Sequence, residues 1–381
     1  MQYRELGHTG IKVSTLGFGC MRLPFNGTPD NIDEPAATKL LHNAIDNGVN
    51  YVDTAWFYHA KVFGQKGESE PLVGRALSGG WRKKVFLATK LPQMAIHAKE
   101  DMEIRLQEQL KRLQTDYIDF YLVHGLDGEN WDRMCGLGVC EFMDSAVKRG
   151  LVRFTGFSFH GHKDDFPRIV DGYSGFSFAQ VQYNYMDTEF QAGYSGLRYA
   201  ADKGLGVVVM EPLKGGKLAQ NLPAEMQAVF DKRKEGWSPA EWALRYVLNE
   251  PRVSVLLSGM NAQQQLDENL RVCSVAEPDS LSKEELSVYD AAIGVMRASI
   301  KADCTACRYC QPCEQGVEIP EILSALNASA MWKTKDQWLT GYMRIKGKPN
   351  LCIECAKCEE ICPQKLPIMQ LLKDTAAVFG G

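Results

Sequence analysis

The chain has 381 residues, a formal net charge of −4 and a hydrophobic fraction of 45%. This charge balance argues against a nucleic-acid partner, which would need a basic surface. The chain shows no apolar segment of the signal-peptide kind at its start and no apolar run long enough to cross a bilayer. We therefore expect a cytoplasmic protein without a membrane partner.

Apolar strand segments alternate with amphipathic helical segments through the first three quarters of the chain. A turn at residues 8–10 first predicts a small hairpin. Strands are predicted over residues 13–20, 51–53, 85–90, 117–124, 152–158, 178–183, 206–210 and 253–257. Helices are predicted over residues 36–47, 69–77, 101–113, 141–148 and 263–275, and glycines at positions 48 and 150 close two of them.

Eight such strands, each short and apolar, predict a parallel sheet that closes into a (β/α)8 TIM barrel of about 250 residues. An open, doubly wound sheet is the alternative, but no G-x-G-x-x-G motif follows the first strand. We expect the barrel over residues 1–280 and a connecting helix within residues 281–303. Residues 304–381 form a small cysteine-rich domain, too short for an ordinary core and so held together by metal.

Three consecutive predicted strands each end in an ionisable side chain. These are Asp53, Lys90 and His124, and Tyr58 lies in the loop after the first of them. Any one of the four alone is typical of a helix cap, a surface charge or a packed ring. At neighbouring ends of parallel strands these side chains would meet at the mouth of a barrel. This end of a (β/α)8 barrel carries the active site in enzymes of that fold.

Together these four side chains suit the reduction of a carbonyl group. The carbonyl oxygen needs a proton as it gains negative charge, and Tyr58 could supply it. We expect Lys90 to lower the pKa of the Tyr58 phenol, and Asp53 to hold Lys90 in place. His124 would donate a hydrogen bond to the substrate oxygen or relay the proton.

The motifs around these residues resemble the aldo-keto reductase superfamily over residues 3–275. They are L-G-F-G at 16–19, D-T-A at 53–55, G-E-S-E at 67–70, T-K at 89–90, D-F-Y-L-V-H at 119–124 and P-L at 212–213. The resemblance implies hydride transfer between NAD(P)H and a small carbonyl or alcohol substrate. It also implies a catalytic tetrad of Asp53, Tyr58, Lys90 and His124.

The resemblance also implies a cofactor site, carried over position by position. The predicted cofactor residues are Gly19, Cys20, Met21, Ser158, Phe159, Gln180, Met210, Glu211, Pro212, Leu213, Gly216, Lys217, Ser258, Gly259, Met260, Asn261, Gln265, Glu268 and Asn269. Gln180 would bind the nicotinamide carboxamide, and residues 211–217 would wrap the pyrophosphate. Residues 258–261, Gln265, Glu268 and Asn269 would surround the adenosine.

Four of these positions depart from the family pattern. Phe159 replaces an asparagine, and Met210 replaces an aromatic ring that stacks on the nicotinamide. Gly259 and Gln265 stand where a lysine and an arginine commonly bind the 2′-phosphate of NADP. The loss of two phosphate partners favours NADH, and NADPH stays open.

Eight of the twelve cysteines lie in two short runs near the end of the chain. The first run is Cys304, Cys307, Cys310 and Cys313, and the second is Cys352, Cys355, Cys358 and Cys362, followed by proline. The second run matches the bacterial ferredoxin pattern, so iron-sulfur ligation is favoured over zinc. In two-cluster ferredoxins the fourth cysteine of each run ligates the other cluster. Cys362 would therefore join the first run and Cys313 the second, giving two [4Fe-4S] clusters.

The whole chain thus resembles aldo-keto reductase barrels that carry a C-terminal ferredoxin-type domain. The first functional hypothesis is an NAD(P)-dependent carbonyl or alcohol oxidoreductase. A second is an electron-transfer enzyme that binds FMN or FAD and passes electrons to a ferredoxin-like partner, since hydride transfer moves two electrons and each cluster passes one. A third is a redox or oxygen sensor, which the intact tetrad disfavours.

Overall fold

The computed structural model describes every residue except 63, 234–235, 305, 334–335 and 381. The described chain divides into two compact units. Unit 1 comprises residues 1–220 and 237–282, and unit 2 comprises residues 221–236 and 283–381. Each unit has its own buried core.

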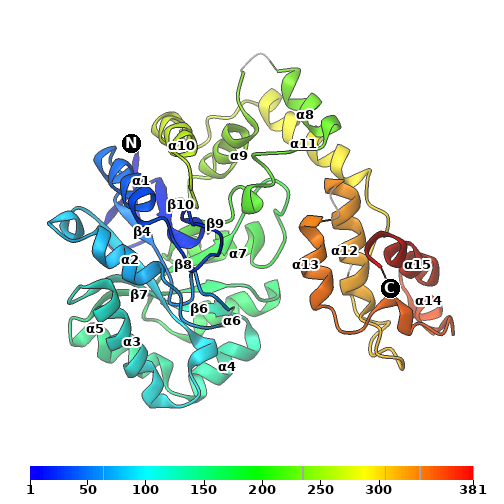
Figure 1. Ribbon diagram of the computed structural model, residues 1–381, viewed down its shortest axis with the longest axis horizontal. Helices are drawn as coiled ribbons and strands as arrows, with labels where there is room; N and C mark the ends of the chain where they lie inside the picture. The colour runs from blue at the N-terminus through cyan, green and yellow to red at the C-terminus, as the bar shows by residue number, and fades with distance from the viewer. Residues whose placement is uncertain (63, 234–235, 305, 334–335, 381) are drawn as a thin grey trace. The chain divides into compact units, whose positions relative to one another are not determined.

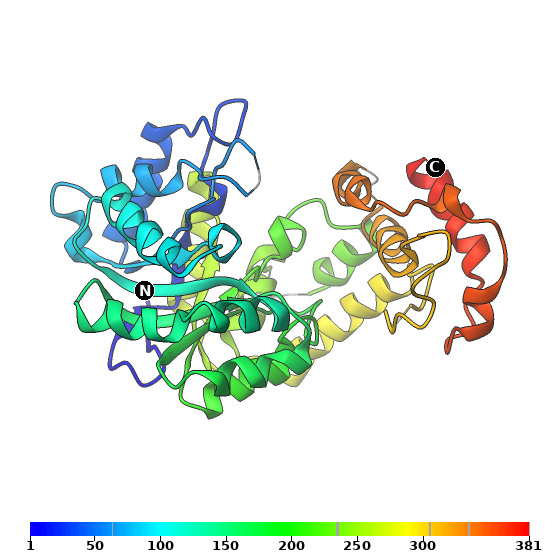
Figure 2. The same ribbon diagram turned by 90° about the horizontal axis from the view of Figure 1, so that it is seen from below.

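Unit 1 contains the predicted closed barrel, and within its described residues eight parallel strands complete the ring in the order β10-β3-β4-β5-β6-β7-β8-β9. The strands are β3 (Leu16–Gly19), β4 (Tyr51–Asp53), β5 (Phe86–Leu91), β6 (Ile118–Leu126), β7 (Val152–Phe159), β8 (Phe176–Gln182), β9 (Gly206–Met210) and β10 (Val253–Ser258). They occupy the middle of the unit in two perpendicular views (Figure 1, Figure 2). The open-sheet alternative is therefore excluded.

Helices cover the outside of this barrel (Figure 1). They are α1 (Glu34–Asp46), α2 (Ser69–Ala76), α3 (Lys99–Leu113), α4 (Gly128–Gly136), α5 (Val139–Lys148), α6 (Phe166–Gly172), α7 (Gly193–Asp202), α9 (Pro239–Leu248) and α10 (Gln263–Val275). Local signals set several boundaries: the Asp33 side chain caps α1 by accepting a hydrogen bond from the Ala36 amide. The two predicted closing glycines, Gly48 and Gly150, have φ angles of 91° and 74°, the left-handed region that glycine adopts freely.

The predicted hairpin consists of β1 (Tyr3–Glu5) and β2 (Lys12–Ser14), paired antiparallel. Its residues Leu6 and Val13 are fully buried and share a core cluster with Tyr51 and Phe120 of the barrel strands. Gly7 approaches β9 so closely that a Cβ at this position would lie 2.2 Å from the Gly206 nitrogen. The hairpin therefore plugs the end of the barrel at which the strands begin, and leaves the other end open.

Unit 2 is helical and carries both cysteine runs. Its helices are α8 (Ala224–Asp231), α11 (Lys283–Arg297), α12 (Ile319–Trp332), α13 (Asp336–Arg344), α14 (Lys357–Ile361) and α15 (Ile368–Phe379). Helix α12 contacts α13 and α15, and α8 contacts α11. The core of its C-terminal part contains Ile322, Leu323 and Leu372, with Cys362 buried among them. Among the described residues, no helix combines the length and the apolar character that crossing a membrane requires.

Candidate functional site

The open end of the barrel brings together the four ionisable side chains that the sequence singles out. The Lys90 amine donates hydrogen bonds to both carboxylate oxygens of Asp53 at 2.7 and 2.8 Å, and to the Thr54 carbonyl at 2.9 Å. It also lies 3.2 Å from the Tyr58 hydroxyl. The rings of Tyr58 and His124 are 6.0 Å apart and nearly perpendicular. In-register parallel pairing of β4, β5 and β6 explains this convergence.

Burial controls the protonation of this cluster. It lowers the pKa of the Lys90 amine, but the charge of Asp53 and contact with Tyr58 outweigh it and leave that pKa above the ordinary 10.5. Burial also raises the pKa of the Tyr58 phenol above its ordinary 10.0, although Lys90 acts in the opposite direction. The lowered phenol pKa expected from the sequence is therefore wrong, because desolvation outweighs the ammonium. Tyr58 stays protonated at neutral pH, as a proton donor must.

His124 is held as a neutral ring. It stacks on Phe57, with ring centroids 4.4 Å apart and planes 10° from parallel. Burial lowers the pKa of His124 well below its ordinary range, and the charge of Lys90 adds to this effect. Its Nδ1 atom is buried and has no hydrogen-bond partner within the described part of the chain. A neutral imidazole with a free ring nitrogen can donate or accept one hydrogen bond at a bound oxygen.

A network of buried polar groups lies behind β5, the strand that carries Lys90. The Glu70 carboxylate accepts hydrogen bonds from Thr89 at 2.7 Å, from Gln109 at 2.6 Å and from Arg112 at 2.9 Å. Gln109 also donates to the Lys90 carbonyl at 3.0 Å. This network fixes β5 against α2 and α3, and so fixes the position of Lys90. Glu70 belongs to the G-E-S-E motif. The sequence pattern alone does not show that Glu70 holds β5 in place.

The four side chains lie at one end of a cavity of about 600 Å³. Asp53, Tyr58 and His124 line it, whereas Lys90 lies fully buried behind its wall. Sixteen of the nineteen predicted cofactor residues also line it: Gly19, Met21, Ser158, Gln180, Met210, Glu211, Pro212, Leu213, Gly216, Ser258, Gly259, Met260, Asn261, Gln265, Glu268 and Asn269.

Three predicted cofactor residues lie outside that lining: Cys20, Phe159 and Lys217. Cys20 and Phe159 are fully buried, and the Phe159 ring packs edge-on against Phe166 at 5.1 Å. Phe159 therefore belongs to the layer between the barrel and α6.

Residues to which the sequence assigned no role also line the cavity: Arg22, Phe57, Gln93, Met94, Gly125, Ala219, Gln220, Ala240 and Leu257. Gly215, which belongs to the predicted pyrophosphate loop, and His160 line it as well. Most of them follow the carboxyl end of a barrel strand, which is the signal that could have identified them.

The cavity offers an unpaired hydrogen-bond acceptor, the side-chain oxygen of Gln180, where a nicotinamide is expected to bind. The Oε1 atom of Gln180 is buried without a hydrogen-bond partner within the described residues, and its Nε2 contacts the Met210 sulfur at 3.7 Å. The Ser158 hydroxyl accepts a hydrogen bond from the Gly125 amide at 2.8 Å. A buried acceptor left unpaired is costly, so the donor group of a carboxamide fits beside Gln180.

At the other end of the cavity the polar groups are mostly paired with one another. Asn269 donates to the Ser258 hydroxyl at 2.9 Å, and the Gln265 carbonyl oxygen accepts from the Asn261 amide at 2.9 Å. Gln265 and Gly259 leave this end without the lysine and arginine of the family pattern. Positions 259 and 265 therefore provide no cation for a 2′-phosphate.

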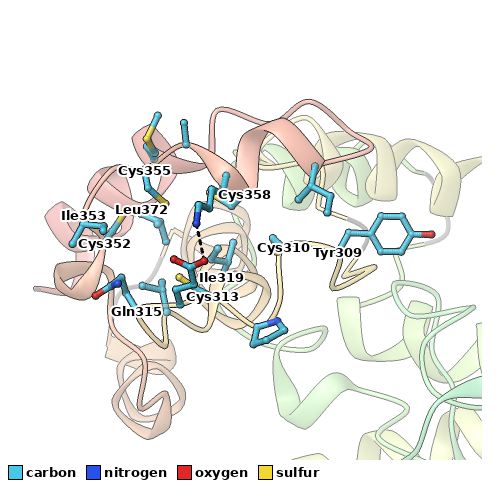
Figure 3. Close-up of a pocket in the computed structure, with 17 residues that line it drawn as sticks. Tyr309, Cys310, Cys313, Gln315, Ile319, Cys352, Ile353, Cys355, Cys358 and Leu372 are labelled. Atoms are coloured by element: carbon cyan, nitrogen blue, oxygen red, sulfur yellow. Dashed lines mark hydrogen bonds and ion pairs between the residues drawn. The ribbon is translucent and has the colours of Figure 1, made fainter.

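In unit 2 the two cysteine runs line two pockets. One is lined by Cys304, Cys307, Cys310 and Cys362. The other, shown in Figure 3, is lined by Cys313, Cys352, Cys355 and Cys358, and Cys310 lines both pockets. The fourth cysteine of each run thus lines the pocket of the other run.

Among the described residues, no disulfide joins any of the twelve cysteines, and no group of three His, Cys, Asp or Glu side chains is arranged around a single point. The cysteines that line the two pockets are of the type that ligates iron-sulfur clusters.

Comparison with known proteins identifies two families along the chain. A profile of the Aldo/keto reductase family matches residues 15–293. A profile of the 4Fe-4S dicluster domain matches residues 303–366. The first match covers most of the chain and includes the four ionisable residues, and the second includes all eight clustered cysteines.

Individual relatives agree with the first family. The chain is 30% identical to the uncharacterized oxidoreductase YrpG of Bacillus subtilis, over 75% of this chain and 94% of that protein. It is 32% identical to the 6-dehydroglucose reductase of Novosphingobium aromaticivorans, over 60% of this chain and 74% of that protein. Among solved structures, aldo-keto reductase AKR11C1 from Bacillus halodurans aligns with a TM-score of 0.63 and 26% identity, over 77% of this chain and 96% of that one.

Proposed function

The chain belongs to the aldo/keto reductase family, and on that premise we propose that it transfers hydride between NAD(P)H and the carbonyl or alcohol group of a small molecule. The observation that carries the proposal is the Lys90 amine, which lies 3.2 Å from the Tyr58 hydroxyl and is held by Asp53. This cluster faces a cavity large enough for a dinucleotide and a small substrate.

The nicotinamide cofactor, when bound, supplies or accepts the hydride. The protein's own residues then handle the proton. Tyr58 gives its phenolic proton to the substrate oxygen as negative charge develops there. The Lys90 ammonium stabilises the phenolate that remains, and Asp53 keeps that ammonium in place. Neutral His124 donates a hydrogen bond to the same oxygen and so orients the carbonyl.

The decisive test is Tyr58→Phe, which removes only the hydroxyl. We expect oxidation of NADH or NADPH by a carbonyl panel to slow by about 10²- to 10⁴-fold, the usual contribution of a positioned acid. The panel includes aldehydes and keto sugars, because one relative is a 6-dehydroglucose reductase. Tyr117→Phe is the matched control, since Tyr117 precedes β6 at the closed end of the barrel. Full activity of Tyr58→Phe would refute the proposal.

We further propose two [4Fe-4S] clusters with crossed ligation. Cys304, Cys307, Cys310 and Cys362 hold one, and Cys313, Cys352, Cys355 and Cys358 hold the other. The lining of the two pockets supports this division. Cys362→Ala should remove the cluster of the first run and Cys313→Ala that of the second, as followed by iron content and electron paramagnetic resonance. Loss of the neighbouring cluster instead would show uncrossed ligation.

The two pockets also favour a second candidate function, because proton and hydride chemistry in the barrel does not need iron. In that function a flavin in the cavity would accept one hydride from the nicotinamide, pass its two electrons singly to the clusters and a ferredoxin-like partner, and release the proton to solvent. Anaerobic protein, assayed for flavin and then mixed with NADH, distinguishes the two. Bleaching of the cluster absorbance supports electron transfer. Turnover of carbonyls without bleaching would assign the clusters a structural or regulatory role. A carbonyl reduction rate that falls in Tyr58→Phe would also exclude a purely sensory protein.

A further inference from the structure

Arg22 is a cation in the barrel cavity that has no hydrogen-bond or ion-pair partner among the residues that the structure describes. It ends the short turn after β3, its side chain is exposed, and it lines the cavity. Within the described part of the chain its guanidinium makes no hydrogen bond and no ion pair. An unpaired guanidinium in a cavity is available for an anionic ligand.

The backbone on both sides of Arg22 is fixed. The Ser69 hydroxyl donates to the Cys20 carbonyl at 3.2 Å. The Leu23 amide donates to Nε2 of His59 at 3.1 Å, and Nδ1 of that ring lies 2.7 Å from the Pro29 carbonyl. The turn is therefore held in place before a ligand binds, while the Arg22 side chain stays free to make contacts.

Two glycines determine where the Arg22 side chain lies. A Cβ added at Gly259 would lie 3.1 to 3.3 Å from the Cβ, Cγ and Cδ atoms of Arg22. A Cβ added at Gly215 would lie 3.0 Å from the Nη2 atom of the guanidinium. The aliphatic part of Arg22 thus crosses Gly259, and the charged end lies beside the loop of residues 211–217. A lysine at position 259 would crowd the side chain in this position.

The surroundings of Gly215 are rich in positive charge. Lys214 is paired with Asp187. Burial lowers the pKa of Lys217 to about 8, and the charges of Lys214 and Arg22 add to this effect against the opposing charges of Glu211 and Asp187. Repulsion among these cations is relieved when a phosphate binds between them. This end of Arg22 therefore suits a diphosphate.

We propose that Arg22 is a specificity residue that binds the diphosphate bridge of the dinucleotide and leaves the 2′-position of the adenosine ribose without a cation. The inference rests on the nicotinamide-dependent function proposed above. It explains how this chain can lose the two cations expected at positions 259 and 265 and still bind a charged dinucleotide. The cation comes from the turn after β3, and the glycine at 259 makes room for it. The cofactor is accordingly NADH.

Calorimetric titration of the purified 381-residue protein tests this role without relying on turnover. The probes are adenosine, ADP, NADH and NADPH. Arg22→Gln should weaken the binding of ADP and of NADH equally, by about tenfold, which corresponds to one charge-assisted contact. Adenosine binding should stay unchanged, and Arg22→Lys should recover part of the loss. Arg198→Gln, an exposed arginine on α7 outside the cavity lining, should bind all four probes like the unmodified protein.

The outcomes separate this inference from the function on which it rests. Equal binding of ADP and NADH by Arg22→Gln and the unmodified protein would refute the role of Arg22 alone. A loss restricted to NADPH would place Arg22 at the 2′-phosphate and also refute it. Absence of NADH and NADPH binding to the unmodified protein would refute the nicotinamide-dependent function, and the inference with it.

Discussion

The barrel mouth and the cysteine pockets hold their reactive groups in opposite ways. In the barrel, Lys90 is fully buried and makes hydrogen bonds to Asp53 and Thr54 within the protein. In unit 2, Cys307 and Cys355 are exposed, and the two cysteine runs line two pockets. The barrel site is thus organised by protein contacts, whereas the proposed clusters would join the cysteine runs.

This contrast follows from the size of the two cores. The barrel strands are covered by a continuous shell of buried apolar residues from its helices, and a core of that size can bear the cost of a buried ion pair. The cysteine-bearing part of unit 2 has a small apolar cluster between α12 and α15. Small domains of this kind usually gain stability from metal ligation. The comparison predicts that the two units respond differently to the loss of their central interactions.

The largest effect is expected for Lys90→Met. Carbonyl reduction should fall by about 10²- to 10⁴-fold because Tyr58 loses its cationic neighbour. The unpaired, buried Asp53 should also lower the free energy of unfolding by about 3–5 kcal/mol. Adding Asp53→Asn removes that charge, so the double variant should regain much of the stability in chemical denaturation but none of the activity. An unchanged stability of Lys90→Met would show that the barrel mouth is not organised by this ion pair.

Removal of iron should affect unit 2 far more than the barrel. Anaerobic chelation should abolish the thermal unfolding transition of the cysteine-bearing helices, as seen in the far-ultraviolet circular dichroism signal. The barrel transition and the affinity for ADP should change little, because their contacts lie within unit 1. Simultaneous unfolding of both units on chelation would show that the barrel depends on the clusters.

The smallest effect concerns pH. In the folded protein the pKa of His124 lies well below the ordinary histidine value of 6.5. The folded state therefore favours the neutral form of this ring. The contribution of neutral His124 to the free energy of unfolding is fully present above pH 6.5 and is lost as the pH falls through the lowered pKa of the folded state. Carbonyl reduction should therefore persist below pH 6.5 and decline only in more acidic buffer. A decline centred on 6.5 that His124→Asn leaves unchanged would assign the titration to another group.

Local chemistry explains why so much of the fold could be predicted from the sequence. Apolar runs, capping residues and closing glycines act over a few positions, so each strand of the barrel was predicted to within a few residues. Residues 13–20 are the exception. They divide into β2, which pairs in the hairpin, and β3, which pairs in the barrel. A single apolar run cannot show that its two halves pair with different partners.

The residue types of the site, the two ferredoxin-type runs and the barrel class could be predicted from spacing along the chain. Properties that depend on contacts between distant segments could be found only in the folded protein. Burial raised the pKa of Tyr58 instead of lowering it, and packing placed Phe159 between layers, away from the cavity. Arg22 met Gly215 and Gly259 only through barrel closure. Desolvation and close packing come from the whole fold, so no local pattern can encode them.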